Sequence, residues 1–308
     1  ETEIVVTCGS TEAMMATMLS ITNPGDKVVI FSPFYENYGA DTILSGAEPI
    51  YVPLVPPEFH FDKEKLEDAF RQGAKALILC NPSNPCGKVF TMEEMQTIAE
   101  LAKKYDAYVV TDEVYEHIVY APYKHIYMQS LEGMRERTIV CNSLSKTYSI
   151  TGWRLGYVIA NPQIIDRVKK VHDFLTVGAA APLMEAAVVG LEFGDGYYDE
   201  LAAHYAHMKE VFVGGLKKLG LKYTDPQGAY YVLVDVSEFG VKDDVKFCEW
   251  MAQFVGVAAV PGSSFFREDV HNLVRFHFAK QDDTLNEAIK RLATLKEKAM
   301  NAKNVDWR

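Results

Sequence analysis

Residues Cys141–Tyr148 read CNSLSKTY; they follow the apolar run Thr138–Cys141 (TIVC) and precede Thr151–Arg154 (TGWR). The apolar run predicts a short buried strand, which places Lys146 at the exit of that strand. An amine in a partly desolvated pocket can lose its charge, and the neutral amine forms a Schiff base with a carbonyl group. The neighbouring hydroxyl groups and Arg154 suit a phosphate, which carries about −1.5 to −2 charge near neutral pH. The stretch therefore predicts a site for a ligand that has both an aldehyde and a phosphate.

Pyridoxal 5′-phosphate (PLP) has both groups and is the cofactor that this stretch predicts. Two other interpretations compete with it. A lysine between hydroxyl residues is commonly no more than part of a polar loop. The spacing from Ser143 to Lys146 also fits the Ser-x-x-Lys motif of penicillin-binding enzymes, but their companion motifs Ser-Asp-Asn and Lys-Thr-Gly are absent from the sequence.

The size and composition of the chain exclude several classes of protein. Its 308 residues suggest about two domains. The net charge of −11 argues against nucleic acid or an anionic membrane surface as the main partner. No apolar stretch approaches the roughly 20 residues that span a bilayer, and no signal-peptide pattern is present. The five cysteines have no metal-binding spacing, so we expect reduced thiols, a cytoplasmic protein and no metal site.

Apolar runs alternate with helical patterns along the first part of the chain. The runs that predict strands are Ile4–Thr7, Val28–Phe31, Pro49–Val52, Ala76–Cys80, Ala107–Thr111, Thr138–Cys141 and Leu155–Ala160. Strands that are apolar throughout are typical of a parallel sheet buried on both faces. We therefore expect an α/β fold, in which a mostly parallel sheet is flanked by helices.

Polar residues follow several of these strands. In a parallel sheet the carboxyl ends meet at one edge, where ligands bind. The candidates at this edge are Asn84, Asp112, Ser143 and Lys146. Ser10 and Thr11 begin a helix whose free N–H groups can bind an anion, although such residues also cap ordinary helices. Tyr35 follows the strand Val28–Phe31 and either lies against a flat ligand or packs in the core.

The pattern changes in the last third of the chain. We expect a large domain over residues 1–190 and a smaller C-terminal α+β domain over residues 191–308, ending in one helix from Asp282 to Ala299. In the predicted strand Leu273–Phe278, Arg275 lies on the face opposite to the apolar side chains. That face is either solvated or presents a guanidinium fork for a substrate carboxylate.

Taken in order, a set of motifs resembles the class I aminotransferases of PLP fold type I. The matching segments are Gly9–Thr11, Pro33–Tyr35, Asn81–Gly87, Asp112–Tyr115, Ser143–Lys146, Thr151–Arg154 and Val274–Phe276. They occur at the approximate spacings of the family and span essentially the whole chain. Cys86 departs from the family pattern, which usually has Thr there, in a turn that is not expected to affect the chemistry. The resemblance implies the PLP transferase fold type I.

The resemblance also implies roles around the cofactor ring. Lys146 would hold PLP as an internal aldimine and later move a proton at the substrate Cα. Asp112 would pair with the pyridine nitrogen, so that the ring withdraws electrons. Tyr115 and Asn84 would hydrogen-bond the phenolic oxygen of the ring, and Tyr35 would stack on its face.

Further residues would bind the charged groups of the cofactor and substrate. The backbone of Ser10 and Thr11, together with Ser143 and Arg154, would bind the phosphate. Arg275 would hold the α-carboxylate of the substrate. The implied reaction moves an amino group from an L-amino acid to a 2-oxo acid by way of a lysine aldimine and pyridoxamine phosphate.

The amino acid donor and some alternative functions stay open. The segments Arg167–His172, Gln227–Tyr231 and Val274–Lys280 are similar to the kynurenine, glutamine and methionine aminotransferase branch. Aspartate aminotransferases share the general pattern, so an aspartate or glutamate donor is the other option. A PLP-dependent carbon–sulfur β-lyase has nearly the same motifs. From a different class, the chain resembles the effector domain of an aminotransferase-like transcription regulator.

The resemblance further implies a homodimer with active sites at the interface. The chain opens with Glu-Thr-Glu, without Met, and passes directly into a strand pattern. We therefore expect an upstream segment of the kind that covers the active site in the family. Without it, the 308-residue chain is expected to bind PLP poorly or to turn over slowly.

Overall fold

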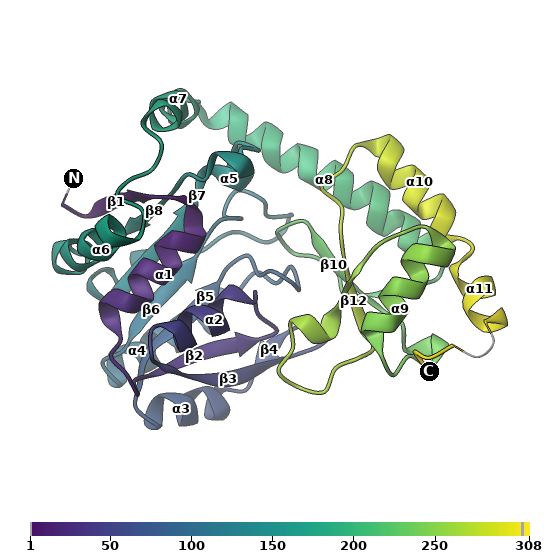
Figure 1. The fold of residues 1–308 in the computed structure, drawn as a ribbon, viewed down its shortest axis with the longest axis horizontal. Coiled ribbons are helices and arrows are strands. Elements are labelled where there is room, and N and C mark those ends of the chain that lie inside the picture. Colours follow the sequence, from purple (N-terminus) through teal and green to yellow (C-terminus); the bar gives the residue numbers. More distant parts are fainter. Residues whose placement is uncertain (1, 303–304) are drawn as a thin grey trace.

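The computed structural model describes residues 2–302 and 305–308. Its largest sheet has eight strands in the order β1-β8-β7-β6-β5-β2-β3-β4 (Figure 1). The strands are β1 Ile4–Thr7, β2 Lys27–Ser32, β3 Glu48–Val55, β4 His60–Phe61, β5 Ala74–Cys80, β6 Tyr108–Asp112, β7 Thr138–Ser143 and β8 Gly156–Ile159. The pairs that join β7, β6, β5, β2 and β3 are parallel, whereas β8 is antiparallel to both β7 and β1. The mostly parallel sheet is therefore confirmed.

Helices cover both faces of this sheet, which explains why its strands are apolar throughout. Val28 and Ile30 of β2 pack with α1, α2 and α6 on one face. Val29 and Phe31 pack with α3 and α4 on the other face. These helices are α1 Gly9–Ile21, α2 Asn37–Leu44, α3 Lys63–Arg71, α4 Met92–Lys104 and α6 Pro162–Leu175. Alternate residues along each strand thus reach two separate apolar layers.

The strand order reverses between β2 and β5. From β2 the chain passes to β3 on one side, whereas β5, β6 and β7 follow one another toward the other side. In open α/β sheets a ligand binds beyond the carboxyl ends of the strands at such a reversal. The segments after β2, β5, β6 and β7 are therefore brought together.

A second, antiparallel sheet has four strands in the order β11-β12-β10-β9. Its strands are β9 Lys222–Tyr223, β10 Tyr231–Asp235, β11 Val260–Pro261 and β12 Leu273–His277. The remaining α-helices are α5 Leu144–Thr147, α7 Ala181–Leu191, α8 Asp195–Lys218, α9 Asp244–Trp250, α10 Asp282–Leu292 and α11 Leu295–Asn301. Helix α8 runs from the vicinity of α5 to the small sheet (Figure 1). No helix in the described part of the chain, the 24-residue α8 included, is long and apolar enough to cross a membrane.

The prediction of one helix over Asp282–Ala299 is wrong, because α10 ends at Leu292 and α11 begins at Leu295. The hydroxyl of Thr294 donates to the carbonyl of Arg291 at 2.8 Å. Such a local bond gives the backbone an alternative to the helical ladder. Leu292 and Leu295 both face the same apolar core, so the break turns α11 onto that core.

The strand predicted over Pro49–Val52 is longer than predicted, because β3 continues to Val55. The extension pairs with the short strand β4, with Leu54 opposite Phe61. Phe61 stacks on Phe31 of β2, with ring centroids 5.3 Å apart. The apolar contact outweighs the prolines of this region, which edge strands tolerate.

Asp41 on α2 is a buried carboxyl group inside the large fold. Only 5% of the residue is exposed, and its Oδ2 has no hydrogen-bond partner among the described residues. Burial raises the pKa of Asp41 to about 7. Because the folded pKa lies above the ordinary value of about 3.9, ionisation destabilises the folded state as the pH rises through this window.

We predict that Asp41→Asn becomes progressively more stable than wild type between about pH 4 and pH 7, because Asn cannot ionise. Urea unfolding of both proteins at several pH values measures the difference in unfolding free energy. The difference should rise with pH and level off above about pH 7. A difference that does not depend on pH would contradict a titrating buried carboxyl at position 41.

Candidate active site

The ends of four strands and the start of α1 surround a cavity of about 170 Å³. Nine of the predicted residues line it: Ser10, Thr11, Tyr35, Asn84, Asp112, Tyr115, Ser143, Lys146 and Arg154. The tenth, Arg275, reaches it through a hydrogen bond from Nη1 to Oδ1 of Asn84 at 2.6 Å. Residues that are up to 265 positions apart in sequence, from Ser10 to Arg275, therefore meet at one place.

Lys146 is presented by α5, a single turn that begins directly at the end of β7. Ser143 caps this turn, since its hydroxyl oxygen accepts the N–H of Ser145 at 3.0 Å. Burial lowers the pKa of Lys146, the negative charge of Asp112 opposes that effect, and the positive charge of Arg154 adds to it. A lowered pKa increases the fraction of neutral amine, which is the form that attacks a carbonyl.

Asp112 ends β6 and is held by two donors. The hydroxyl of Tyr38 donates to its Oδ2 at 2.7 Å, and the N–H of Val114 donates to its Oδ1 at 3.3 Å. Burial raises the pKa of Asp112, whereas these two hydrogen bonds and the charge of Lys146 lower it. Sequence analysis missed Tyr38. Tyr38 comes three residues after Tyr35, but this spacing indicates a second site residue only when the turn that joins the two residues is known.

Arg154 packs against the first residue of α1. A Cβ atom on Gly9 would lie 2.6 Å from Nη2 of Arg154, so only glycine permits this contact. A Cβ atom on Gly156 would likewise lie 2.6 Å from the backbone nitrogen of Ser10. Arg154 itself has a left-handed backbone, with φ 54° and ψ 54°. Such a backbone costs a non-glycine residue about 1 kcal/mol or more and is concentrated at functional sites.

The start of α1 and Arg154 together form an anion cradle. The N-cap residue Cys8 provides no side-chain hydrogen bond to the helix, so the first N–H groups of α1 are not capped from within. Those groups belong to the turn that carries Ser10 and Thr11, which line the cavity beside Arg154. A phosphate at this position would meet helix N–H groups, the positive end of the helix dipole and a guanidinium.

Two aromatic side chains hold Arg275 at the rim of the cavity. Its guanidinium carbon lies 4.4 Å from the ring centre of Tyr231 and 4.3 Å from that of Phe265. Arg275 forms no ion pair with an acidic side chain in residues 2–302 and 305–308. The hydroxyl of Tyr231 also lies 2.9 Å from that of Tyr115. Tyr231 is not among the site residues predicted from the sequence, although it ends Gln227–Tyr231, one of the segments that resemble an aminotransferase branch.

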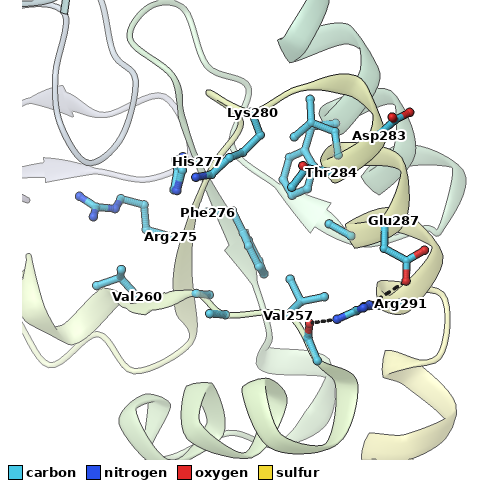
Figure 2. A pocket seen from close by; sticks show the side chains of 16 residues that line it. Val257, Val260, Arg275, Phe276, His277, Lys280, Asp283, Thr284, Glu287 and Arg291 are labelled. Carbon is cyan, nitrogen blue, oxygen red and sulfur yellow. Dashed lines mark hydrogen bonds and ion pairs between the residues drawn. The ribbon is translucent and has the colours of Figure 1, made fainter. Parts of the chain in front are cut away.

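A larger hollow of about 680 Å³ lies between β12 and α10 (Figure 2). Arg291 within it is bonded to Glu287 and to the carbonyl of Gly256. The side chain of Arg275 points away from α10 (Figure 2). The lysine, carboxylate and helix start that suit an aldehyde and a phosphate surround the smaller cavity instead, so we assign the chemistry to that cavity.

A polar cluster lies in the segment that follows β6. Glu113, Glu116 and His125 place one potential ligand atom each within 4.8 Å of one another. The carboxylates are already engaged: Glu113 accepts the hydroxyl of Thr111 at 2.7 Å, and Glu116 accepts the amide of Asn142 at 2.7 Å. We therefore assign the cluster to fixing the loop after β6 against β7.

Comparisons with known proteins agree with this geometry. The family described as "Aminotransferase class I and II" matches residues 1–292, and the chain belongs to this family. A probable N-succinyldiaminopimelate aminotransferase of Mycobacterium tuberculosis is 36% identical over 97% of this chain and 78% of its own length. The methionine aminotransferase of Escherichia coli is 33% identical over 96% of this chain and 77% of its own length.

Solved structures show the same fold. The N-succinyldiaminopimelate aminotransferase from Mycobacterium tuberculosis superposes with a TM-score of 0.92 over 96% of this chain and 78% of that one, at 36% identity. A double mutant of the aspartate aminotransferase from Thermus thermophilus superposes with a TM-score of 0.88 over 96% of this chain and 76% of that one, at 30% identity. The chain thus has the PLP transferase fold type I.

The chain is a PLP-dependent aminotransferase, which moves an amino group from an amino acid to a 2-oxo acid. The residues present fit the cofactor: an amine with a lowered pKa, a carboxylate held by two donors and an anion cradle all face one cavity. When bound, PLP supplies a ring that accepts the electrons left at the substrate Cα.

Proposed function

We propose that Lys146 is the residue that bonds the cofactor and then carries the proton at the substrate Cα. The observation that supports this most is its half-buried amine, whose pKa is lowered by burial and which shares one cavity with Asp112 and Arg154. When it is not bonded to the cofactor, the neutral amine of Lys146 would be able to accept a proton from the substrate Cα. General base catalysis by a positioned side chain contributes about 10²–10⁴-fold.

Asp112 is proposed to pair with the pyridine nitrogen of the cofactor. Tyr38 and Val114 hold its carboxylate in place, so its charge stays directed at one point of the cavity. Tyr115 and Asn84 are proposed to donate to the phenolic oxygen, and Tyr35 to stack on the ring. Because the amide oxygen of Asn84 accepts from Arg275, its amide nitrogen is the atom left to donate.

The phosphate is proposed to bind at the start of α1. Backbone N–H groups of Ser10 and Thr11 and the guanidinium of Arg154 would neutralise its charge. Ser143 joins them, although its hydroxyl already caps α5 and lies 2.6 Å from that of Ser145. Ser145 lines the same cavity and is therefore a further candidate phosphate ligand.

Arg275 is proposed to hold the α-carboxylate of the substrate. Asn84 and the rings of Tyr231 and Phe265 fix its planar fork. A fork held in one geometry suits bidentate recognition of a carboxylate.

We propose a donor with a neutral side chain, of the methionine, aromatic or kynurenine type. Among the described residues that line the cavity, Lys146 and Arg154 are the two cations. In the proposed roles, both interact with the cofactor and neither is free to bind the substrate side chain. Arg275 then serves the α-carboxylate, which leaves none of the cations among residues 2–302 and 305–308 at the cavity for the second carboxylate of aspartate. The methionine aminotransferase of Escherichia coli and a rat kynurenine–oxoglutarate transaminase are among the relatives.

A homodimer is proposed on the basis of an exposed apolar surface on and around α7. Its members are Phe174 (91% exposed), Val177 (79%), Val188 (44%), Val189 (61%), Leu191 (58%) and Phe193 (42%). Large exposed apolar side chains concentrated in one segment of a soluble protein, here residues 174–193, are typical of an interaction site. Gly190, in the same helix, contacts Tyr148, two residues after Lys146, so the interface would lie beside the active site.

The division into domains at about residue 190 is likewise proposed. Most of the residues that form the apolar core around the small sheet come from position 205 onward. A cytoplasmic location is proposed because all five cysteines are free thiols, as expected in a reducing compartment.

We predict that Lys146→Ala loses at least about 10²–10⁴-fold in turnover, the usual loss when a general base is removed. The visible absorbance of the lysine-bound cofactor should disappear in the same variant. Lys88→Ala, which removes another buried lysine, is the matched control and should keep the band. Near-normal turnover of Lys146→Ala would contradict the assignment.

We predict that methionine, an aromatic amino acid or kynurenine converts the visible band of the PLP-loaded protein faster than aspartate does. The reason is that the described residues that line the cavity provide no further cation for a second carboxylate. Stopped-flow absorbance with single amino acids measures the rates. Fastest conversion by aspartate or glutamate would contradict the proposed donor class, and release of pyruvate and ammonia without an acceptor would indicate a β-lyase.

We predict that Val189→Glu shifts the protein from dimer to monomer in sedimentation velocity, because a charge would be buried at the interface. Val245→Glu, at a valine of α9 that is 46% exposed, is the control and should leave the dimer intact. A monomeric wild-type protein, or an unchanged Val189→Glu dimer, would contradict the proposed interface.

A further inference from the structure

The helical turn that carries Lys146 is too short to be stable without contacts from the rest of the fold. Helix α5 has four residues, and a helix of this length has little internal stability. Within it, the N–H of Tyr148 donates to the carbonyl of Leu144 at 3.1 Å. The carbonyl of Ser145 accepts from the N–H of Ile150 at 3.1 Å. Other contacts must fix the direction of the backbone next to Lys146.

One of these contacts comes from a distant helix. The hydroxyl of Tyr197, in the first turn of α8, donates to the carbonyl of Thr147 at 2.7 Å. Thr147 directly follows Lys146 and is 7% exposed. Without this donor, a carbonyl at the end of α5 would have to find water or turn away, at the cost of a lost hydrogen bond.

Aromatic rings reinforce this contact. Tyr148 stacks on Tyr197 with ring centroids 5.6 Å apart and planes at 22°, and its hydroxyl lies 2.9 Å from that of Tyr198. The ring of Phe193 lies 4.8 Å from that of Tyr197. We call Tyr148, Phe193 and Tyr197 the aromatic clamp.

Helix α7 also packs against Tyr148, through Gly190. A Cβ atom on Gly190 would lie 3.2 Å from the ring of Tyr148. This is tighter than most real contacts, so the glycine lets α7 and Tyr148 approach closely. The segment from Gly190 to Tyr198 therefore packs against the residues that directly follow Lys146.

We propose that Tyr197 is a positioning residue for Lys146: its hydroxyl, supported by the aromatic clamp, fixes the backbone of α5 and hence the direction of the lysine amine. The inference rests on the proposed role of Lys146. Tyr197 touches neither cofactor nor substrate in this account and acts through the carbonyl of Thr147. It joins the start of α8 to the reacting group.

The test compares Tyr197→Phe with Tyr198→Phe in the PLP-loaded protein. Both variants lose one hydroxyl from neighbouring residues of α8, but only Tyr197 bonds the backbone of α5. For Tyr197→Phe we expect a changed visible circular dichroism of the cofactor. The half-reaction at saturating amino acid should slow about five- to tenfold, the loss that one net hydrogen bond allows, with unchanged substrate affinity. Tyr198→Phe should stay within about twofold of wild type.

Thr91→Ala controls for a general loss of stability, because it removes the capping box of α4 and leaves α5 untouched. It should lower the melting temperature without changing the cofactor spectrum. Equal rates and spectra for Tyr197→Phe and wild type would overturn the inference. Peptide mapping of the wild-type protein separates this result from a failure of the Lys146 assignment, in which the cofactor would be found on another lysine.

Gly190→Ala provides an independent test from the other side of the clamp. Alanine favours a helix more than glycine does, so α7 should not lose stability. The added methyl group should displace the ring of Tyr148 and change the same circular dichroism band. An unchanged band in a variant of equal or higher melting temperature would overturn the role of the clamp.

Discussion

The structure depends on the partial desolvation of one amine. Lys146 is half-buried between a carboxylate that favours its charge and a guanidinium that opposes it, and burial is the largest of the three effects on its pKa. Each neighbour has a second task, since Asp112 faces the ring of the cofactor and Arg154 its phosphate in our account. On the proposed roles, the two charged groups that shift the pKa of Lys146 would also orient the cofactor, so the reactivity of the amine would depend on correct cofactor binding.

Close backbone approach makes this arrangement possible. Gly9 and Gly156 remove the Cβ atoms that would separate Arg154, the start of α1 and β8. Arg154 comes just before β8, which is antiparallel to its neighbour β1. The start of β8 therefore lies beside the end of β1, where α1 begins, and this places Arg154 at the start of α1. An arginine with a left-handed backbone is retained at this junction because the surrounding contacts hold it there.

The sequence was sufficient to predict the features that depend only on which residues follow which strand along the chain. Asp112 and Lys146 could be placed at one edge because each directly follows an apolar strand, and parallel strands end together. Tyr38 and Tyr231 could not, because their hydroxyls reach Asp112 and Tyr115 across 74 and 116 residues. The break between α10 and α11 was missed because Leu285, Ile289, Leu292 and Leu295 keep helical spacing through it, while a local bond of Thr294 ends the ladder. The clamp on Tyr148 could not be predicted from the sequence for the same reason as Tyr38: its partners, Gly190, Phe193 and Tyr197, lie more than 40 positions further along the chain.

The central claim is that one lysine, Lys146, bonds the cofactor. Borohydride reduction of the PLP-loaded protein makes that bond permanent, and peptide mass spectrometry then locates it. The account predicts the added mass on the peptide that contains Lys146 and on no other. An added mass on a different lysine, or none after full loading, would contradict the assignment of this cavity as the active site.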